Sequence, residues 1–473
     1  MNKYYITNAI PYVNGDPHIG HALEFIQSDT VARYHRLLGD KVTYLCGSDE
    51  NALKNVQAAE KAGADVQAFV DEHAAIFARV AEKLEISFDI FQKTSQDTHY
   101  KASQKLWELC DKNGDIYKKS YKGLYCVGCE EFKTPEELVN GECPEHPGKK
   151  VEEVEEENYF FKLSKYQEAL LKLLESGKYQ VVPEFRKNEL LSFIKSGLED
   201  FSISRSNERA KNWGIPVPGD TTQRIYVWFD ALNVYQSGIG FGSDNEKYEQ
   251  TWPADLHVVG KGIIRFHAVY WPAILLSAGL KLPKKLFVHE YFTVNGQKMS
   301  KTLGNVINPV EMVEKYGADA LRYYCLAKFS PFSDGDFSEE RLKETYNSDL
   351  ANGLGNLAAR VGRLAQTNEI AVPVDTLSIL PEVASSLEEF KFNQALESIW
   401  REIAKVDKQL NDTTPWKLGK VEATPILEQA VRDIRTIAYN LQPFLPESAK
   451  KILEQYNQEK ITSGTPLFPR LDK

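Results

Sequence analysis

The stretch YYITNAIPYVNGDPHIGH, at residues 4–21, decides the fold of this chain. Tyr4–Ile6 form an apolar and aromatic strand signal, a loop containing Pro11 and Gly15 follows, and apolar residues take up a helical spacing from Ile19. In α/β proteins the loop between a strand and its helix binds phosphates, because free backbone N–H groups and the helix dipole favour anions there. The stretch therefore predicts a parallel α/β fold with a nucleotide site at this loop.

Two histidines stand at the predicted start of that helix. His18 and His21 flank Gly20, which lets the backbone come close to a ligand. Their imidazoles can donate hydrogen bonds to a triphosphate and to its transition state. The alternative interpretation is a helix-capping histidine beside a surface histidine, and a single His-x-Gly-His does not decide between them.

A second stretch, VNGQKMSKTLGN at residues 294–305, supplies the complementary charge. Lys298 and Lys301 lie three residues apart in a glycine-bearing loop, with the hydroxyls of Ser300 and Thr302 beside them. Together they can approach one triphosphate, although a pair of solvated surface lysines would have the same spacing.

HIGH at 18–21 and KMSKT at 298–302 together resemble the paired signatures of the class I aminoacyl-tRNA synthetases, and within them the methionyl-tRNA synthetase family. The family usually ends its second signature in Ser, and Thr302 keeps the hydroxyl. The resemblance implies that His18, His21, Lys298 and Lys301 are catalytic. It also implies that Gly20 and Ser300 help to bind ATP, which would come with Mg²⁺.

Composition bounds the class of protein. A chain of 473 residues, 42% hydrophobic and 26% charged, is long enough for two or three domains. It has no apolar run of membrane-spanning length and no targeting segment at its start, so we expect a cytoplasmic protein without a membrane partner. The formal net charge of −10 does not decide for or against a nucleic-acid partner, because acidic residues concentrate locally, as in EEVEEE at 152–157.

Three of the six cysteines cluster with a histidine. Cys126 and Cys129 form one Cys-x-x-ligand knuckle, and Cys143 and His146 form a second. This spacing predicts one structural zinc held by three thiolates and one imidazole, the alternative being unpaired loop thiols. The remaining cysteines are expected to be small buried apolar side chains: Cys46, Cys110 and Cys325.

The same family resemblance gives a methionine pocket. SDENA at 48–52 stands where the family usually has TDEHG, so Asp49 would take the ammonium group while Asn51 and Ala52 depart from the pattern. YVWFDALNVY at 226–235 and GKGIIRFHAVYW at 260–271 match the rest of the pocket. By motif position, the residues around the methionine side chain would be Ile10, Tyr12, Trp228, Ala231, Leu232, Tyr235, Ile263, His267 and Trp271. Taken one at a time, the aromatic residues are as well explained by core packing.

The order of the expected strands and helices, together with the family resemblance, predicts how the chain is divided into domains. Strands are expected at 4–6, 41–45, 225–229, 257–259 and 287–289, and helices at 19–38, 52–63, 66–84, 166–176, 266–278, 339–346, 352–367, 392–410, 426–441 and 448–455. These give a Rossmann-type parallel sheet split by a zinc-containing insertion and followed by an all-α bundle. The expected domains are 1–112 and 225–338 for the two catalytic halves, 113–224 for the connective insertion, and 339–473 for a helical anticodon-binding domain.

The family resemblance implies that this last part binds the anticodon, with matching positions at Asn356, Arg360 and Trp416. Asn356 and Arg360 stand one turn apart on a predicted helix and can read base edges, while Trp416 offers a stacking surface for an unpaired base. The alternative for Trp416 is a packed loop aromatic. The oligonucleotide-binding domain that dimerises some relatives is not found here, so we expect a monomer.

The expected activity is that of a methionine–tRNA ligase, acting on ATP, L-methionine and tRNA(Met) through a methionyl adenylate. The insertion is too short for the editing domain of the synthetases for leucine, isoleucine and valine. Two other hypotheses remain, a small-molecule nucleotidyltransferase and an inactive tRNA-binding relative. The first would need neither the zinc insertion nor Trp416, and the second would be expected to lose signature residues.

Overall fold

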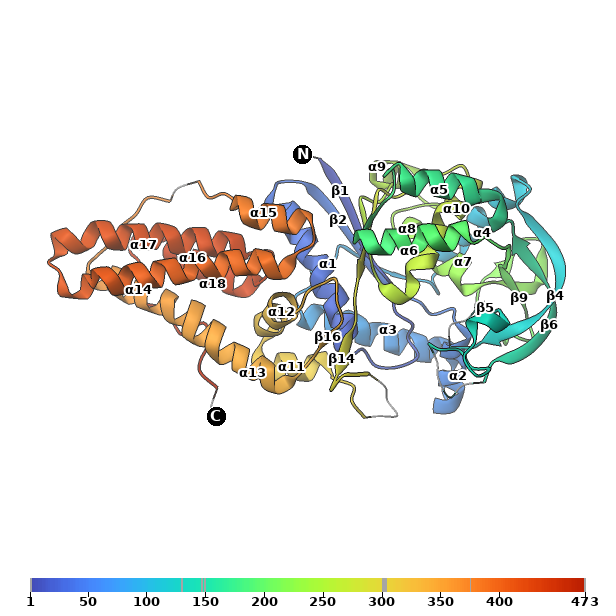
Figure 1. The fold of residues 1–473 in the computed structure, drawn as a ribbon, viewed down its shortest axis with the longest axis horizontal. Helices are drawn as coiled ribbons and strands as arrows, with labels where there is room; N and C mark the ends of the chain where they lie inside the picture. The colour runs from blue at the N-terminus through green and yellow to red at the C-terminus, as the bar shows by residue number, and fades with distance from the viewer. Residues whose placement is uncertain are drawn as a thin grey trace.

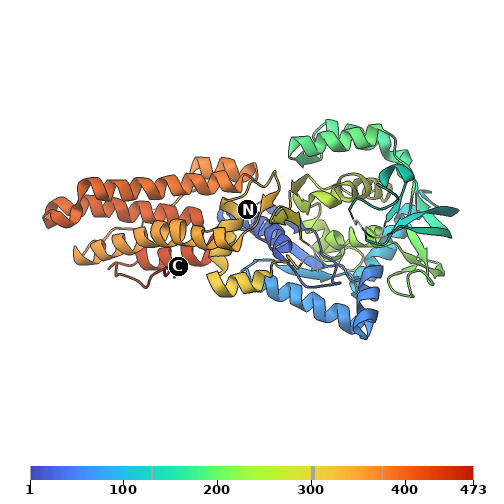
Figure 2. The same ribbon diagram turned by 60° about the horizontal axis from the view of Figure 1, so that its bottom comes forward.

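A computed structural model describes residues 2–128, 131–145, 148, 150–299, 304–374 and 376–471. A part built around a parallel sheet carries an arm of long helices, which extends away from the sheet in both views (Figures 1 and 2). The two parts are contiguous in packing, because α12 (Ala318–Ala327) contacts both α1 (Ile19–Leu37) and α16 (Phe392–Thr413).

The central sheet has six parallel strands in the order β3-β2-β1-β12-β13-β7. Their bounds are β1 Lys3–Asn8, β2 Lys41–Ser48, β3 Ile90–Lys93, β7 Gln180–Val182, β12 Leu256–Gly260 and β13 Lys285–His289. The strands predicted at 4–6, 41–45, 257–259 and 287–289 are thereby confirmed. β2 and β3 extend the sheet on one side of β1, whereas β12 and β13 extend it on the other. Parallel sheets bind ligands at such a switch point in the strand order.

Successive side chains along the strands alternate between two apolar cores, one on each face of the sheet. Ile6 and Phe287 belong to the core shared with α1 and α3 (Val66–Lys83), whereas Tyr5 and Val288 belong to the core shared with α4 (Asp97–Lys112) and α10 (Trp271–Ser277). Burial on both faces is what near-continuous apolar strands predict. α2 (Leu53–Ala62), α8 (Val234–Ser237) and α9 (Asn245–Thr251) complete this part.

The strand predicted at 225–229 is wrong. β11 (Asp220–Ile225) ends where that strand was to begin, and Val227–Ala231 form the helix α7. β11 lies outside the parallel sheet and pairs antiparallel with β9 (Ser204–Ser206) and β10 (Pro216–Val217). The error has a physical origin, since a short apolar run buried on all sides has the same composition in a strand and in a helix.

The stretch from 113 to 224 forms a mostly antiparallel unit beside the sheet. β4 (Ile116–Cys126), β5 (Glu131–Lys133), β6 (Glu152–Phe161) and β8 (Phe201–Ser202) make its sheet, with α5 (Gln167–Glu175) and α6 (Glu184–Lys195) beside it. The acidic run on β6 is mostly exposed, as predicted. One of its segments, β7, pairs with β13 and so belongs to the parallel sheet.

The helical arm begins beyond a small three-stranded sheet, β14 (Phe292–Val294), β15 (Gln297–Lys298) and β16 (Gly335–Asp336). It contains α11 (Pro309–Tyr316), α12, α13 (Glu339–Thr345), a π-helical turn over Tyr346–Gly355, α14 (Asn356–Thr367), α15 (Pro381–Glu388), α16, α17 (Lys420–Leu441) and α18 (Pro446–Tyr456). The helices predicted in this part are confirmed, with shifts at their ends, whereas α11, α12 and α15 were not predicted. Among the described residues, none of the helices has both the length and the apolar composition that crossing a membrane requires.

A buried arginine joins the arm to the sheet. Arg322 of α12 lies 2.7 Å from Asp29 of α1, and its Nε donates to the carbonyl oxygen of Phe444 at 2.8 Å. Both charged side chains are fully buried, so removing either one would leave the other as an uncompensated buried charge. The contact holds the turn between α17 and α18 against α1, the helix that His18 caps.

Candidate functional site

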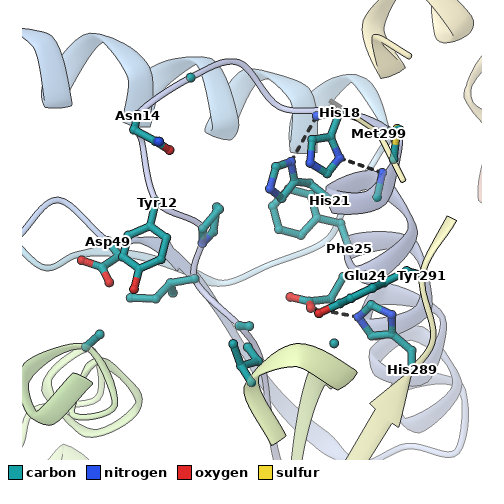
Figure 3. A pocket seen from close by; sticks show the side chains of 18 of the residues that line it. Tyr12, Asn14, His18, His21, Glu24, Phe25, Asp49, His289, Tyr291 and Met299 are labelled. Atoms are coloured by element: carbon teal, nitrogen blue, oxygen red, sulfur yellow. Dashed lines mark hydrogen bonds and ion pairs between the residues drawn. The ribbon is translucent and has the colours of Figure 1, made fainter. Parts of the chain in front are cut away.

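A cavity of about 550 Å³ opens at the carboxyl ends of β1, β2, β12 and β13 (Figure 3). The β1–α1 loop forms one wall, and α7 and α8 contribute others. It brings together thirteen of the residues predicted from sequence: Ile10, Tyr12, His18, Gly20, His21, Asp49, Trp228, Ala231, Leu232, Tyr235, Ile263, His267 and Lys298. Segments more than 280 residues apart in the chain therefore meet in one cavity.

Several other predicted residues are elsewhere. Trp271 is fully buried behind the wall, edge-on to Tyr235 with ring centroids 6.5 Å apart, and does not line the cavity. It can support the pocket but not contact a ligand in this arrangement. Ser300, Lys301, Thr302, Cys129 and His146 lie outside the described residues.

His18 and His21 form the N-terminal cap of α1. His18 Nδ1 accepts from the backbone N–H of Gly20 at 3.1 Å, and the backbone N–H of His18 donates to His21 Nδ1 at 3.1 Å. The two rings stack with centroids 3.9 Å apart (Figure 3). Desolvation, with the neighbouring His18, lowers the pKa of His21 well below its usual range. Because Nδ1 accepts in both rings, a neutral ring carries its proton on Nε2, which can donate to a ligand.

Gly20 is required by this stacking. A Cβ at this position would lie 2.9 Å from Cε1 and 3.0 Å from Nδ1 of His18, and 3.5 Å from Cε of Met299. Met299, next to Lys298, thus packs against the start of α1. The first stretch also contacts the backbone two residues after the second, because the N–H of Ile19 donates to the carbonyl of Ile307 at 3.0 Å.

Asp49 is a buried carboxylate at the end of β2 that lies across the cavity from the two histidines (Figure 3). Its backbone N–H donates to Pro11 at 2.8 Å, and its Oδ1 accepts from the N–H of Asn51 at 3.2 Å. Burial, with Asp230 and Glu50 nearby, raises the pKa of Asp49 well above its usual range. A cation bound against it would reverse that effect, so the site is suited to an ammonium group.

Asn51, a departure from the family motif, has a defined role here. Its Nδ2 donates to Asp230 at 2.7 Å and to the carbonyl of Thr94 at 3.1 Å. Asp230 is in turn hydrogen-bonded to the buried ring of His99. The turn that carries Asp49 is therefore fixed by buried polar contacts.

The apolar end of the cavity contains one oriented polar pair. His267 Nδ1 lies 3.0 Å from the carbonyl oxygen of Ile263, which can only accept, and burial lowers the pKa of this imidazole to about 4. Nε2 of the neutral ring therefore accepts from the hydroxyl of Tyr235 at 2.7 Å. Trp228 stacks on Phe266 with centroids 3.7 Å apart and forms a flat wall beside them. Such a space fits an apolar chain with one weakly polar atom.

Two lining residues that sequence reasoning missed contact each other through their polar side chains. Glu24, one turn after His21 on α1, lies 2.9 Å from Nε2 of His289, and Nδ1 of His289 donates to the carbonyl of Glu290 at 2.9 Å. A signal for His289 existed, because it ends a predicted strand at the carboxyl edge of the sheet. The other lining residues that were missed are Ala9, Pro11, Asn14, Gly15, Asp16, Phe25, Glu145, Gly260, Tyr291, Phe292 and Met299.

Lys298 is the described lysine of the second signature. Its ammonium group lies 3.5 Å from Oε2 of Glu145, and both side chains are largely exposed. Glu145 comes from the predicted zinc region, so that region reaches the mouth of the cavity. An exposed pair of this kind contributes little stability, which leaves the lysine available to a phosphate.

The predicted zinc ligands are only partly described. Cys126 and Cys143 are buried, although Pro144 and Glu145, which follow Cys143, are exposed. Within the part of the chain that the structure describes, no three side chains form a metal-binding group, and two of the four predicted ligands lie outside it. Cys46, Cys110 and Cys325 are buried, as predicted.

The three predicted anticodon residues gather on the helical arm. Asn356 begins α14 and is exposed, and Arg360 follows one turn later. The guanidinium of Arg360 lies over the ring of Trp416 at 4.6 Å and donates to Asp407 at 2.9 Å and Asn411 at 2.7 Å. Trp416 is 45% exposed, so it is not buried in a core, although one face packs against Arg360.

Comparison with known proteins agrees with this geometry. The family model described as tRNA synthetases class I (M) matches residues 4–154 and 146–362. The methionine–tRNA ligase of Thermotoga maritima is 41% identical over 99% of this chain and 80% of its own length. That of Brucella suis is 42% identical over 96% of this chain and 91% of its own.

Solved structures give the same result. Mycobacterium tuberculosis methionyl-tRNA synthetase in complex with methionyl-adenylate superposes with a TM-score of 0.91 at 37% identity, covering 99% of this chain and 100% of that one. The apo form of that enzyme gives a TM-score of 0.86 at 33% identity.

Proposed function

The chain belongs to the class I methionyl-tRNA synthetase family, and from that premise we propose which of its residues bind methionine, ATP and tRNA. Its activity is that of a methionine–tRNA ligase, which joins methionine to tRNA at the expense of ATP. The observation that carries the assignment is the single cavity with a buried carboxylate and an apolar wall at one end and two capping histidines at the other.

Methionine occupies the end near Asp49. Its ammonium group pairs with that carboxylate, and its side chain lies among Trp228, Tyr235 and His267, with Ile10, Tyr12, Ala231, Leu232 and Ile263 around them. The thioether is polarisable and a weak acceptor, which suits aromatic walls beside one oriented hydroxyl. Trp271 supports Tyr235 from behind. A pocket of this kind discriminates weakly against a chain one methyl shorter, so homocysteine is expected to enter.

ATP occupies the end near the start of α1. The Nε2–H groups of His18 and His21, together with the helix dipole, donate to the phosphates, and Gly20 leaves room for the rings. Lys298 leaves Glu145 for the triphosphate, and Lys301 and Ser300 act with it. Mg²⁺ is used with ATP in this family, and its charge would offset that of the phosphates. The methionine carboxylate then attacks the α-phosphorus, and pyrophosphate leaves.

The helical arm reads the anticodon. Asn356 and the Arg360–Trp416 pair offer an amide, a guanidinium and an exposed aromatic face, which together suit unpaired bases. The division into 1–112, 113–224, 225–338 and 339–473 is proposed on the same grounds, with β7 shared between the insertion and the sheet. The protein is proposed to act as a monomer.

The zinc site is proposed from its donor set. Cys126, Cys129, Cys143 and His146 supply three thiolates and one imidazole, which suit tetrahedral Zn²⁺ and leave no position for substrate. The burial of Cys126 and Cys143 in a largely exposed region supports this assignment. The metal would stabilise the segment that carries Glu145 to the cavity.

Exchange of pyrophosphate into ATP, measured without tRNA across the twenty amino acids and homocysteine, tests the proposal. Methionine should support exchange best and homocysteine should be the strongest competitor. Equal or better exchange with a branched or charged amino acid would contradict the assignment of the pocket.

A further inference from the structure

A second, smaller cavity lies beside the methionine end of the first and contains three arginines. It is lined by Asn51, Leu53, Tyr125, Arg205, Arg209, Ala210, Trp213, Arg224, Ile225, Tyr226 and Val227. The two cavities share walls, because Asp49 and Trp228 line the first while Asn51 and Val227 line the second. Trp213 closes this wall by donating from Nε1 to the carbonyl of Glu50 at 2.8 Å.

Nearby carboxylates balance only part of the positive charge of the three guanidinium groups. Arg205 is only 7% exposed, and its Nη1 donates to Ser202 Oγ at 2.9 Å and to the carbonyl of Ser204 at 2.7 Å, which are both neutral acceptors. Arg209 has one carboxylate partner, the exposed Glu152 at 3.1 Å. In the described ranges Arg205 and Arg224 form no ion pair, and the buried Nε atoms of all three arginines have no hydrogen-bond acceptor.

Aromatic rings hold the guanidinium groups in place. The guanidinium carbon of Arg205 lies 4.3 Å from the ring centre of Tyr226, and that of Arg209 lies 4.3 Å from the ring centre of Tyr125. Cation–π contacts orient a guanidinium without neutralising it. A buried charge without a counter-ion is costly, so the cluster is suited to an anion that comes from outside the protein.

We propose that this three-arginine cavity binds a backbone phosphate of the single-stranded 3′ end of tRNA during methionyl transfer. The inference deepens the proposed function and rests on it. The 3′-terminal adenosine must bring its hydroxyl to the methionyl carbonyl, which places its own phosphodiester near the methionine end of the main cavity. Guanidinium groups match phosphate oxygens in charge and in geometry.

The phosphates of ATP are a less suitable occupant of the three-arginine cavity. They are assigned to His18 and His21, which lie on the opposite side of the main cavity from Asp49 (Figure 3). The second cavity is lined by Asn51, two residues after Asp49, and by Val227, next to Trp228. An anion there lies on the methionine side, where the tRNA end must arrive.

The test uses Arg224→Gln, which removes the charge of a half-buried side chain and keeps a planar polar group. Losing a charge-assisted hydrogen bond to the phosphate should lower kcat/KM for tRNA roughly tenfold or more, mainly by raising KM. Because the target is single-stranded, the slope of log kcat/KM against log salt should fall by about 0.7. Exchange of pyrophosphate without tRNA and the melting temperature should stay unchanged. Arg79→Gln, on the exposed face of α3, is the matched control and should change none of these.

Arg224→Lys separates charge from geometry, and it should recover most of the salt slope. Unchanged charging and slope in Arg224→Gln would overturn the proposal. A parallel fall in charging, exchange and melting temperature would show that the arginines only hold the insertion to the sheet, and a fall in exchange alone would show an ATP contact. Failure of the wild-type protein to exchange with methionine would count against the proposed function instead.

Discussion

Replacing Asp49 with Asn should weaken methionine binding and stabilise the empty enzyme at the same time. Burial of the carboxylate, together with the nearby Asp230 and Glu50, raises its pKa well above the ordinary value. Asn keeps the shape and can still accept from the N–H of Asn51, but it cannot be charged. The two effects have opposite signs because the same charge is costly without substrate and useful with it.

The loss of affinity follows from burial. Removing one partner of a buried charge pair costs about 2–5 kcal/mol, which corresponds to roughly 30- to 5,000-fold in kcat/KM for methionine. The KM for ATP should change little, because its phosphates are proposed to bind at His18 and His21, which lie across the cavity from Asp49 (Figure 3).

The stability effect depends on pH in a defined direction. In the unfolded chain an Asp ionises near pH 4, whereas in the folded protein the pKa of Asp49 is higher. The folded state therefore binds this proton more tightly, so wild-type stability is lost as pH rises from the unfolded pKa through the folded one. The melting temperature of Asp49→Asn should match wild type near pH 4 and exceed it increasingly toward pH 8.

Thermal unfolding at several pH values and pyrophosphate exchange, measured on the same preparations, check both effects. An unchanged methionine KM would remove Asp49 from the binding site. A melting temperature below that of wild type at pH 8 would refute the reasoning about its burial.

Three further changes test the other parts of the site. Gly20→Ala places a Cβ 2.9 Å from the ring of His18, so adenylate formation measured by rapid quench should slow at least tenfold while methionine binding is retained; loss of binding instead would contradict the assignment to ATP. Trp416→Ala should lower tRNA charging about tenfold to hundredfold by removing a stacking surface, with exchange and melting temperature nearly unchanged because this side chain is 45% exposed; joint loss of all three would reject the anticodon role. Protein prepared without chelators should contain about one zinc per chain by metal analysis, and Cys126→Ser should lose it; a metal-free wild-type protein would exclude the zinc site.

Local signals in the sequence predicted four strands of the parallel sheet and the helix start that carries His18 and His21, but not β3 or β7. The β1–α1 unit was recognisable because strand, loop and helix signals follow one another without interruption in residues 4–37. His18 and His21 then lie where such a unit places them, and the capping bonds explain their spacing.

Other features depend on tertiary packing that a single segment does not encode. The run from Val227 to Ala231 is apolar throughout apart from Asp230, so its composition does not separate a strand from a helix. In the structure it is a helix whose Trp228 packs on Phe266 and edge-on to Tyr12. Trp271 follows the family motif but is fully buried in the core, directly after the π-helical turn Phe266–Tyr270. The pairing of Glu24 with His289 and the gathering of the three arginines join residues that are distant along the chain, so no spacing in the sequence indicated them.

The most direct test of the account is an experimental structure of this protein with methionyl adenylate bound. The account predicts the ammonium group within hydrogen-bonding distance of Asp49, the thioether beside Tyr235 and His267, and the phosphate at the start of α1 near His18 and His21. An adenylate bound in the reverse orientation, or an ammonium group that does not contact Asp49, would contradict it.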